Sequence, residues 1–468
     1  MAPPAPREYV RFEIVDLCGR ALSKTVPKRH AKSPVYMYAG AIAFGTNSEV
    51  THFPEEIDKA GFPNAELVPD WSTEQVLPWA ARPGAIVSRV HCGVRLGGAA
   101  LPALPRGICA RLFEELREEG FKMLIGGEQE FTLCRRGHVG RAWEPLFNGV
   151  DVFATLQNCK AMDFCYEVER CMEPVGVDIT VMHAEYGAGQ VEMVFAPHLG
   201  LEACDMLATF RTGTKEIAQN QGLLASFFTR PFGVEGVGNG GHFNFSLWRW
   251  RSRQDFLPFG DLGFLADMKL AAMWSTHDNA FHSAEAAEGL SVEAGRFLAG
   301  ILAHAPALEA LCAPTPACYT RHGHWAPPLA TWGLDDRLAA VRVKADRAAH
   351  PAHCYMELRM PSAAANPYLV AAGLAAAGLD GLRRELELPP ARLTKEQGAV
   401  ELPTTLEAAL ATLEADAYMV GKLGADFVRW YTGVKRAELK FIEERLSKGA
   451  RSDEEVSEAW QHLYLEAL

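Results

Sequence analysis

The segment Phe121–Cys134 restricts the possible folds of this chain more than any other part of the sequence. Its pattern predicts one long strand or a pair of strands. Side chains two residues apart share a face of a strand, so Glu128 and Glu130 lie together while Phe131 and Leu133 point the other way. Two adjacent carboxylates repel each other unless a cation lies between them or one of them holds a proton. On this motif alone, a solvated strand face is the simpler interpretation.

Two further segments add acids and bases to predicted strands. In residues 183–192, H-A-E-Y-G-A-G-Q-V-E, two acids flank a turn that contains glycine. The glycine-rich segment 236–241 leads into a predicted strand, and it lacks the Lys-Ser/Thr pair of a P-loop, so it is a weak indication of phosphate binding. One face of that strand carries His242, Asn244 and Ser246.

A last predicted strand, Tyr355–Met360, places Glu357 and Arg359 on one face. Upstream of it lie three more arginines: Arg321, Arg337 and Arg342. Hard oxygen ligands with a single imidazole suit Mg²⁺ or Mn²⁺ better than zinc. Arginines beside such ions indicate phosphoryl transfer.

The 468 residues are too many for one compact core, and two domains are the natural expectation. Short strands and loops fill the chain to about Gly98, after which a linker is expected at residues 101–106. Beyond it, acid-bearing strands alternate with helices, which predicts an α+β fold. We expect helices at Ile108–Glu118, at Glu202–Gln219, from an N-cap at Asn366 to about Leu386, and over most of the chain from Leu406.

Charge and cysteine content narrow the class of protein. The net charge is −12, from 46 basic and 58 acidic residues, which argues against nucleic acid or an anionic membrane as partner. None of the 11 cysteines forms a CxxC pair, so reduced thiols are expected. The N-terminus is too polar for a signal peptide, and no apolar run reaches the length of a membrane span. We therefore expect a cytoplasmic protein.

Taken in order, the motifs resemble those of the glutamine synthetase superfamily. E-x-E is followed by H-x-E-Y-x-x-G-Q-x-E, a glycine-rich segment leading into H-x-x-x-S, an arginine near W-A-P, E-x-R-x-P and A-N-P-Y-L. The resemblance covers nearly the whole chain. Within the superfamily the chain resembles the lengsin branch at Val10–Glu13, Ser23–Pro27 and Arg211–Gly213.

This resemblance implies a fold and an assembly. A small N-terminal β-grasp domain, residues 1–101, would precede a large catalytic domain of guanido-kinase-like type, residues 102–468, with a curved antiparallel sheet backed by helices. Members of the family usually form homo-oligomers of two stacked hexamers, with each active site between neighbouring subunits.

The resemblance also assigns roles to residues. One metal ion would be held by Glu130, Glu185 and Glu192, and the other by Glu128, His242 and Glu357. Glutamate would bind to Arg321, Arg359 and the backbone at Gly238. The ATP site would include Arg337, Arg342, Asn244 and Ser246. The catalytic residues would be Glu185, Arg321 and Arg337.

The implied reaction has two steps. The γ-carboxylate of glutamate attacks the γ-phosphorus of ATP, with Mg²⁺ or Mn²⁺ and arginines offsetting charge on the transferred group. An amine nitrogen then attacks γ-glutamyl phosphate, and phosphate leaves. The product is glutamine when the amine is ammonia.

The chain departs from the family pattern at five places. Trp325 stands where the ammonia-using enzymes have a flap glutamate, and it cannot accept a proton from ammonium. The segment Phe44–Ser48 stands where an ammonium-binding aspartate is found. A loop histidine is Asn244 here, and a loop asparagine is Val237. Tyr355 replaces an arginine of the nucleotide site.

Two hypotheses explain these departures. The first is a ligase that uses a primary amine in place of ammonium. The second is a catalytically inactive, lengsin-like structural or chaperone-like protein that keeps the fold and the ring, with intermediate filament proteins as partners. The six retained metal ligands favour the ligase, because an unneutralised cluster of like charges is costly without a cation.

Overall fold

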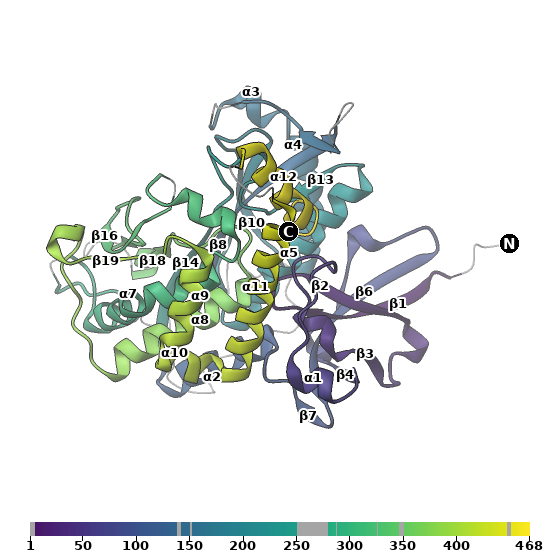
Figure 1. Cartoon of the computed structure of the whole chain (residues 1–468), viewed down its shortest axis with the longest axis horizontal. Coiled ribbons are helices and arrows are strands. Elements are labelled where there is room, and N and C mark those ends of the chain that lie inside the picture. The colour runs from purple at the N-terminus through teal and green to yellow at the C-terminus, as the bar shows by residue number, and fades with distance from the viewer. Residues whose placement is uncertain are drawn as a thin grey trace.

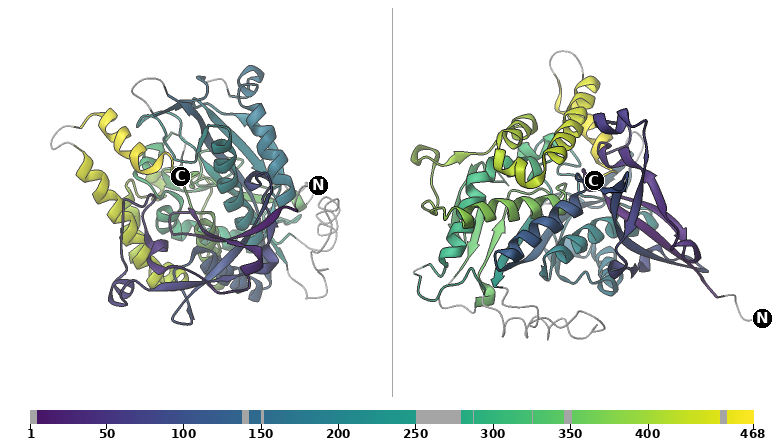
Figure 2. Two further views of the ribbon diagram at one scale, coloured as in Figure 1. Left: turned by 90° about the vertical axis from the view of Figure 1, so that its right-hand side faces the viewer. Right: turned by 90° about the horizontal axis from the view of Figure 1, so that it is seen from below.

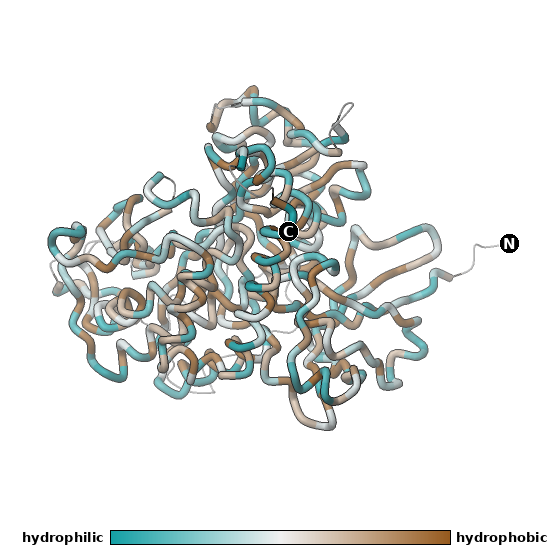
Figure 3. The backbone as a smooth tube through the Cα atoms, viewed as in Figure 1, coloured by the Kyte–Doolittle hydropathy of each residue, from teal (hydrophilic) through white to brown (hydrophobic). Residues whose placement is uncertain are grey.

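The computed structural model describes residues 5–137, 142–149, 152–249, 279–286, 288–324, 326–345, 351–446 and 451–468. They form two large β-sheets and many helices, so the predicted α+β class is confirmed. In Figure 1 the N-terminal strands lie at one end of the molecule, and the long C-terminal helices cross its middle. Apolar residues gather in the interior strands and helices, while many peripheral loops are polar (Figure 3). None of the described helices has the length and apolar character that a membrane crossing requires.

The first sheet is built from the N-terminal residues. Its strands within the described chain are β1 (Arg7–Val15), β2 (Ala21–Pro27), β3 (Val35–Tyr38), β4 (Asn64–Pro69), β5 (Gln75–Val76), β6 (Ala85–Leu96) and β7 (Ala99–Ala100). The order is β2-β1-β6-β4-β3, with β5 and β7 also paired to β6. In β1, Val10, Phe12 and Ile14 are buried on one face, and Glu13 and Val15 are buried on the other. The turn to β2 contains Gly19 at φ +82°, a conformation that glycine adopts without strain.

The second sheet carries the acidic motifs. Its described strands are β8 (Phe121–Arg136), β9 (Trp143–Pro145), β10 (Ile179–Ala184), β11 (Gln190–Phe195), β12 (His198–Leu199), β13 (Leu224–Ser226), β14 (Gly241–Arg249), β16 (Trp332–Leu334), β17 (Val341–Lys344) and β18 (Tyr355–Leu358). The order is β10-β11-β8-β14-β18-β17-β16, and β9, β12 and β13 also pair with β8. The pairs are antiparallel except β16 with β17. A separate ribbon joins β15 (Leu329–Ala330) to β19 (Val400–Glu401).

The long strand β8 has the two faces that its sequence predicts. Phe131 and Leu133 are fully buried, and the ring of Phe131 packs against Phe164, Phe210 and Phe227 at centroid distances of 5.4–6.2 Å. Burial of one such side chain contributes about 1.5–3 kcal/mol to stability. This packing fixes the opposite orientation of Glu128 and Glu130, because neighbouring side chains of a strand alternate.

Helices cover the apolar side of this sheet and fill the space toward the first sheet. The helices of the described residues are α1 (Glu55–Lys59), α2 (Pro105–Glu118), α3 (Thr155–Asn158), α4 (Met162–Met172), α5 (Leu201–Asn220), α7 (Val292–Cys312), α8 (Pro367–Arg383), α9 (Leu406–Ala415), α10 (Ala417–Leu423), α11 (Ala425–Arg445) and α12 (Asp453–Tyr464). Helices α2 and α5 pack on β8, and α8 packs on α2, α5 and α7. A Cβ on Gly300 of α7 would lie 2.7 Å from the backbone nitrogen of Gly381 in α8, so this close packing requires glycine.

Two helix starts can be compared with the sequence. Helix α8 begins after Asn366, whose side chain accepts a hydrogen bond from the backbone nitrogen of Tyr368 at 3.1 Å, as the predicted N-cap requires. Helix α2 begins at Pro105, inside the predicted linker 101–106, because proline fits the first turn of a helix. The linker is therefore shorter than predicted. A domain boundary at residue 101 stays a prediction.

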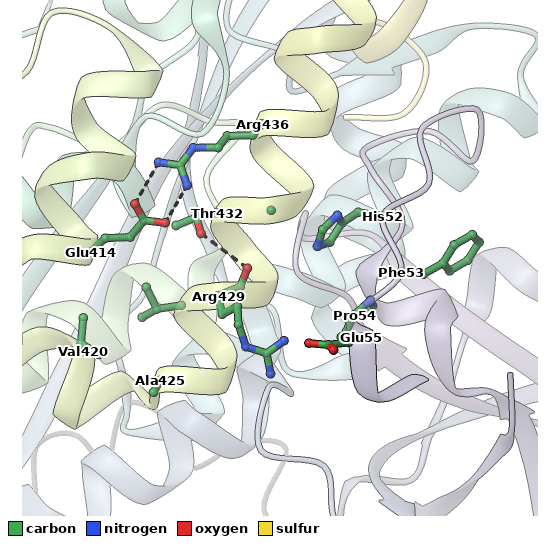
Figure 4. Close-up of a pocket in the computed structure, with 12 residues that line it drawn as sticks. His52, Phe53, Pro54, Glu55, Glu414, Val420, Ala425, Arg429, Thr432 and Arg436 are labelled. Carbon is green, nitrogen blue, oxygen red and sulfur yellow. Dashed lines mark hydrogen bonds and ion pairs between the residues drawn. The ribbon is translucent and has the colours of Figure 1, made fainter. Parts of the chain in front are cut away.

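The N-terminal part of the chain packs against the C-terminal helices. Figure 2 shows the N-terminal sheet beside helices α11 and α12. Between them, the buried ammonium of Lys435 lies 3.0 Å from Glu438 and 3.4 Å from the sulfur of Cys18. A cavity of about 530 Å³ opens nearby, between residues 52–55 and the face of α11 that carries Arg429, Thr432 and Arg436 (Figure 4).

Candidate active site

Strand pairing gathers charged and polar side chains on one face of the large sheet. Residues directly opposite each other on antiparallel strands have Cβ atoms about 4.5–5.5 Å apart. In order across the sheet, the opposed pairs are His183 with Glu192, Glu192 with Glu130, Glu128 with His242, Asn244 with Glu357, and Glu357 with Arg342. The pairing of Glu192 with Glu130 sets like charges opposite each other, which destabilises a sheet without a compensating cation.

The first group consists of Glu128, His242 and Glu357, whose potential ligand atoms lie within 4.8 Å of one another. Nδ1 of His242 is 3.4 Å from Oε2 of Glu128 and 3.5 Å from Oε1 of Glu357. Burial alone would raise the pKa of Glu128, but the interactions with His242 and Asn244 lower it to about 2. Nε2 of His242 is buried and has no hydrogen-bond partner among the described residues. An imidazole whose Nδ1 faces two carboxylates fits a cation ligand.

The second group consists of His183, Glu185 and Glu192, whose potential ligand atoms also lie within 4.8 Å of one another. Nε2 of His183 is 3.2 Å from Oε1 of Glu192. Burial raises the pKa of Glu185 to about 7, and the charges of Glu130 and Glu192 act in the same direction. A carboxyl group whose pKa is raised in this way lies in a concentration of negative charge, which a bound cation would offset.

Glu130 lies beside both groups. Its Oε2 accepts hydrogen bonds from the backbone nitrogen of Gly240 at 2.8 Å and from Nε2 of Gln190 at 2.6 Å. Burial, and then the charge of Glu192, raise the pKa of Glu130. The family resemblance groups Glu130 with Glu185 and Glu192, whereas the structure brings His183 into that group and leaves Glu130 next to it. The donor set of carboxylate oxygens with imidazole fits a hard divalent cation such as Mg²⁺ or Mn²⁺.

The glycine-rich segment passes close to Arg321. A Cβ on Gly240 would lie 3.1 Å from Nη2 of Arg321 and 3.3 Å from Nε2 of His242. A Cβ on Gly238 would lie 2.7 Å from a backbone oxygen, closer than real side chains approach. The guanidinium of Arg321 is buried, and its Nε has no hydrogen-bond partner among the described residues. A buried cation with an unused donor suits an anionic ligand.

A cavity of about 780 Å³ opens onto both groups. Three predicted arginines line it besides Arg321: Arg337, Arg342 and Arg359. Nε of Arg359 donates to the carbonyl oxygen of Arg337 at 2.9 Å, and Nη1 of Arg342 lies 3.0 Å from Oε2 of Glu357. Arg359 also forms an ion pair with Glu357. The cavity is thus rich in carboxylates toward β10 and β11, and rich in arginines toward β17.

Two predicted nucleotide residues lie differently along β14. The side-chain amide of Asn244 donates to Oε1 of Glu128 at 2.9 Å, so it supports the first group. Ser246 is buried, accepts a hydrogen bond from Nε1 of Trp248 at 3.0 Å, and is not among the described residues that line the cavity. Its nucleotide role stays a prediction.

The structure describes some, but not all, of the positions at which the chain departs from the family pattern. Val237 lines the cavity next to Gly238. Burial raises the pKa of Tyr355, and the charges of Glu128 and Glu357 add to the rise, so this phenol lies beside the first group. Trp325 lies outside the described residues.

The departing segment Phe44–Ser48 packs against α11. There the backbone nitrogen of Thr46 donates a hydrogen bond to the carboxylate of Glu438. This contact places the segment beside the C-terminal helices, and its residues are not among the described residues that line the cavity.

Sequence reasoning missed three supporting residues. His183 belongs to the second group, and the signal was its place two residues before Glu185. Gln190 accepts from the backbone nitrogen of Gly187 at 2.8 Å and donates to Glu130, so one buried amide joins two motifs. The amide of Asn239 donates to Thr132 and to the carbonyl oxygens of residues 226 and 228, which holds the glycine-rich segment on the strands beneath it. These amide roles depend on contacts between distant segments.

Comparison with known proteins agrees with the geometry. A family model described as the catalytic domain of glutamine synthetase matches residues 102–258 and 270–452. The chain belongs to the glutamine synthetase family. The resemblance inferred from the motifs is thereby confirmed.

Relatives within the glutamine synthetase family include two kinds of protein. Lengsin of Canis lupus familiaris is 29% identical over 464 residues, which cover 92% of this chain and 71% of lengsin. A glutamine synthetase of Methanocaldococcus jannaschii is 30% identical over 453 residues, which cover 92% of this chain and 91% of that enzyme. The resemblance to lengsin expected from the sequence is therefore confirmed. The chain is about equally similar to lengsin and to the archaeal enzymes, at 29% and 30% identity.

Solved structures of the family share this fold. A protein described as a novel glutamine synthase homolog has a TM-score of 0.78 and 25% identity, covering 99% of this chain and 100% of that one. A GmaS/ADP complex has a TM-score of 0.75 and 26% identity, covering 95% of each chain.

Proposed function

We propose that this protein is an ATP-dependent ligase that joins ammonia or a primary amine to the γ-carboxylate of glutamate through γ-glutamyl phosphate. The observation that carries the proposal is the convergence of two carboxylate–histidine groups and the buried cation Arg321 on one cavity. Such a site can hold an anionic substrate against divalent cations, which is what phosphoryl transfer to a carboxylate requires.

Two divalent cations, Mg²⁺ or Mn²⁺, would be held by the two groups, and when bound they would offset negative charge on the transferred phosphoryl group. In this proposal the ligands are Glu128, His242 and Glu357 on one side, and Glu130, Glu185 and Glu192 with His183 on the other. The raised pKa of Glu185 and the position of Nδ1 of His242 between two carboxylates support these assignments.

The chain's own residues would bind and orient the reactants. Arg321, with Arg359 and the backbone at Gly238, would hold the carboxylates of glutamate. Arg337 and Arg342 would contact the phosphates of ATP from the β17 side of the cavity. Glu185, with the cation it holds, would face the incoming amine from the opposite, β10 side of the cavity.

Named relatives and a structural neighbour support this proposal. Archaeal relatives at 30% identity are named glutamine synthetase, which is a ligase activity. The structural neighbour GmaS is described as a complex with ADP, which favours ATP as co-substrate here. We extend to this chain the family's homo-oligomer, a dodecamer of two stacked hexamers.

The experiment that tests the proposal measures ADP release by the purified protein with ATP, glutamate and Mg²⁺ or Mn²⁺. The nucleophiles are ammonium, hydroxylamine and a panel of primary amines. We expect ADP release that requires both glutamate and a nucleophile, and its loss in Glu128→Ala. Glu444→Ala is the matched control, because the exposed Glu444 pairs with Lys440 on α11, and no described residue of α11 lines the cavity.

Absence of turnover with every nucleophile, in protein shown to be folded and assembled, would overturn the ligase proposal. That result would support the alternative, a non-catalytic lengsin-like protein. Loss of assembly together with activity in Glu128→Ala would show that the first group also stabilises the fold.

A further inference from the structure

Two aromatic side chains border the cavity at its β10 end. Phe153 and Tyr186 line it beside His183, Glu185 and Glu192. Their exposed fractions are 64% and 40%, large values for aromatic residues next to a carboxylate cluster. We call these two residues the aromatic wall. An exposed apolar surface inside a concave polar site indicates a contact with part of a ligand.

The conformation of Phe153 is unusual and is held in place. Its φ angle is +62°, in the left-handed region, which costs a bulky residue of order 1–3 kcal/mol. Its backbone nitrogen donates to the carbonyl oxygen of Ala184 at 3.3 Å, and its ring meets the ring of His183 edge-on at 4.8 Å. The chain therefore keeps an exposed ring at the cavity despite backbone strain.

The order of strands determines which reactant meets this wall. Arg342, on β17, lies toward one end of the sheet, and β10 is the strand at the other end (Figure 1). Arg321 and the glycine-rich segment lie between these ends, over β8 and β14. If nucleotide approaches the arginines and glutamate binds in the middle, the remaining reactant is the nucleophile, and it enters at β10.

We infer that the aromatic wall binds the hydrocarbon body of a primary amine, so that the nucleophile is an alkylamine or arylalkylamine in preference to ammonium. This inference rests on the proposed ligase function. Aromatic faces attract both alkylammonium groups and apolar chains, so the wall suits both parts of such an amine.

The bond changes are those of amide formation. The alkylammonium ion first loses one proton to water and becomes a neutral amine. Its nitrogen lone pair forms the C–N bond to the carbonyl carbon of the γ-glutamyl phosphate, and the electron pair of the C=O π bond moves to oxygen. As the C=O bond re-forms, the C–O bond to phosphate breaks, its electron pair leaves with phosphate, and the nitrogen releases a second proton to water.

The test compares a series of unbranched amines, from methylamine to pentylamine, with phenethylamine, ammonium and hydroxylamine. Glutamate-dependent ADP release gives kcat/KM for each. In the wild-type protein, kcat/KM should rise about two- to fourfold for each methylene that reaches the wall. In Phe153→Gly this rise with chain length should disappear, and glycine also removes the strain at φ +62°. Tyr186→Ala should reduce the rise in the same way.

Phe62→Gly is the matched control. Phe62 is also a phenylalanine at positive φ, +59°, and is 48% exposed, but it packs on Phe53 in the N-terminal part of the chain. It should leave the dependence on amine length unchanged.

Three outcomes would overturn the inference. Turnover with ammonium or hydroxylamine and no gain with chain length would leave the ligase standing and remove the wall from amine binding. An unchanged slope in Phe153→Gly, with altered oligomer mass in light scattering, would show that the wall contacts a second copy of the chain. No turnover with any nucleophile would overturn the ligase function and this inference together.

Discussion

Arg342 on β17 and Glu357 on β18 stand directly opposite each other, with Nη1 of the arginine 3.0 Å from Oε2 of the glutamate. Arg342 also pairs with Asp335 on its other side. The two carboxylates differ in their surroundings, because the side chain of Glu357 is 3% exposed and that of Asp335 is 69% exposed. Only the buried carboxylate belongs to a candidate cation group.

Glu357→Gln should abolish most turnover, with kcat reduced about 100-fold or more, because it removes a charged ligand from the first group. Asp335→Asn removes the exposed partner of the same arginine and should change activity less than about twofold, as surface ion pairs contribute about 0–1 kcal/mol. Glutamate-dependent ADP release gives the rates, and thermal unfolding reports whether each variant is folded. Equal losses in the two variants would contradict a role for Glu357 as ligand.

Divalent cations should stabilise the protein in the absence of substrates. At a concentration 100 times the dissociation constant, binding to the folded state alone adds about 2.7 kcal/mol to the free energy of unfolding. Glu192→Gln should reduce the rise in Tm caused by Mg²⁺ or Mn²⁺, since Glu192 belongs to the second group. Differential scanning fluorimetry with and without a chelator measures this rise in Tm, and Asp335→Asn is the control. A shift that is the same in Glu192→Gln and wild type would place the cation elsewhere.

The sequence pattern predicted which side chains share a face of one strand better than it predicted which residues of different strands lie together. The alternation in Phe121–Cys134 correctly separated Glu128 and Glu130 from the apolar face, because that face is decided within one strand. The grouping of His183 with Glu192 follows from the register of β10 on β11, which depends on long-range packing and on the turn between them. The hydrogen bond from Gln190 to Glu130 could not be predicted for the same reason, because it joins residues of different strands.

Alternation alone also cannot tell how far a site extends along a strand. His242, Asn244 and Ser246 share a face of β14, yet Ser246 pairs opposite Leu124, beyond the edge of the cavity.

The stability of the helical layer should depend on the protonation of His304. Nδ1 of this residue lies 2.6 Å from Oδ2 of Asp416, and Nε2 lies 3.0 Å from Oδ2 of Asp380. Burial alone would lower the pKa of His304, but the two aspartates raise it above its usual value. Because the folded pKa is raised, the stabilisation is complete below the unfolded pKa of about 6.5 and is lost as pH rises through the folded value.

His304→Gln should therefore cost about 1.5–3 kcal/mol of unfolding free energy near pH 6, and progressively less at higher pH. Urea unfolding of wild type and variant between pH 6 and pH 9 would measure the difference. His30→Gln is the control, because His30 is exposed. A difference that stays constant over this range would show that His304 contributes by packing alone.

Val237→Asn should strengthen glutamate binding. Val237 borders the cavity next to Gly238, where the family resemblance expects an asparagine that contacts glutamate. One regained hydrogen bond contributes about 1 kcal/mol, which corresponds to about a fivefold lower dissociation constant for glutamate. Titration calorimetry in the presence of Mg²⁺ measures this constant without requiring turnover, and Val237→Ala separates the added amide from the loss of a branched side chain. Equal constants in the two variants would mean that glutamate does not reach residue 237, and that the departure at this position reflects a different placement of the substrate.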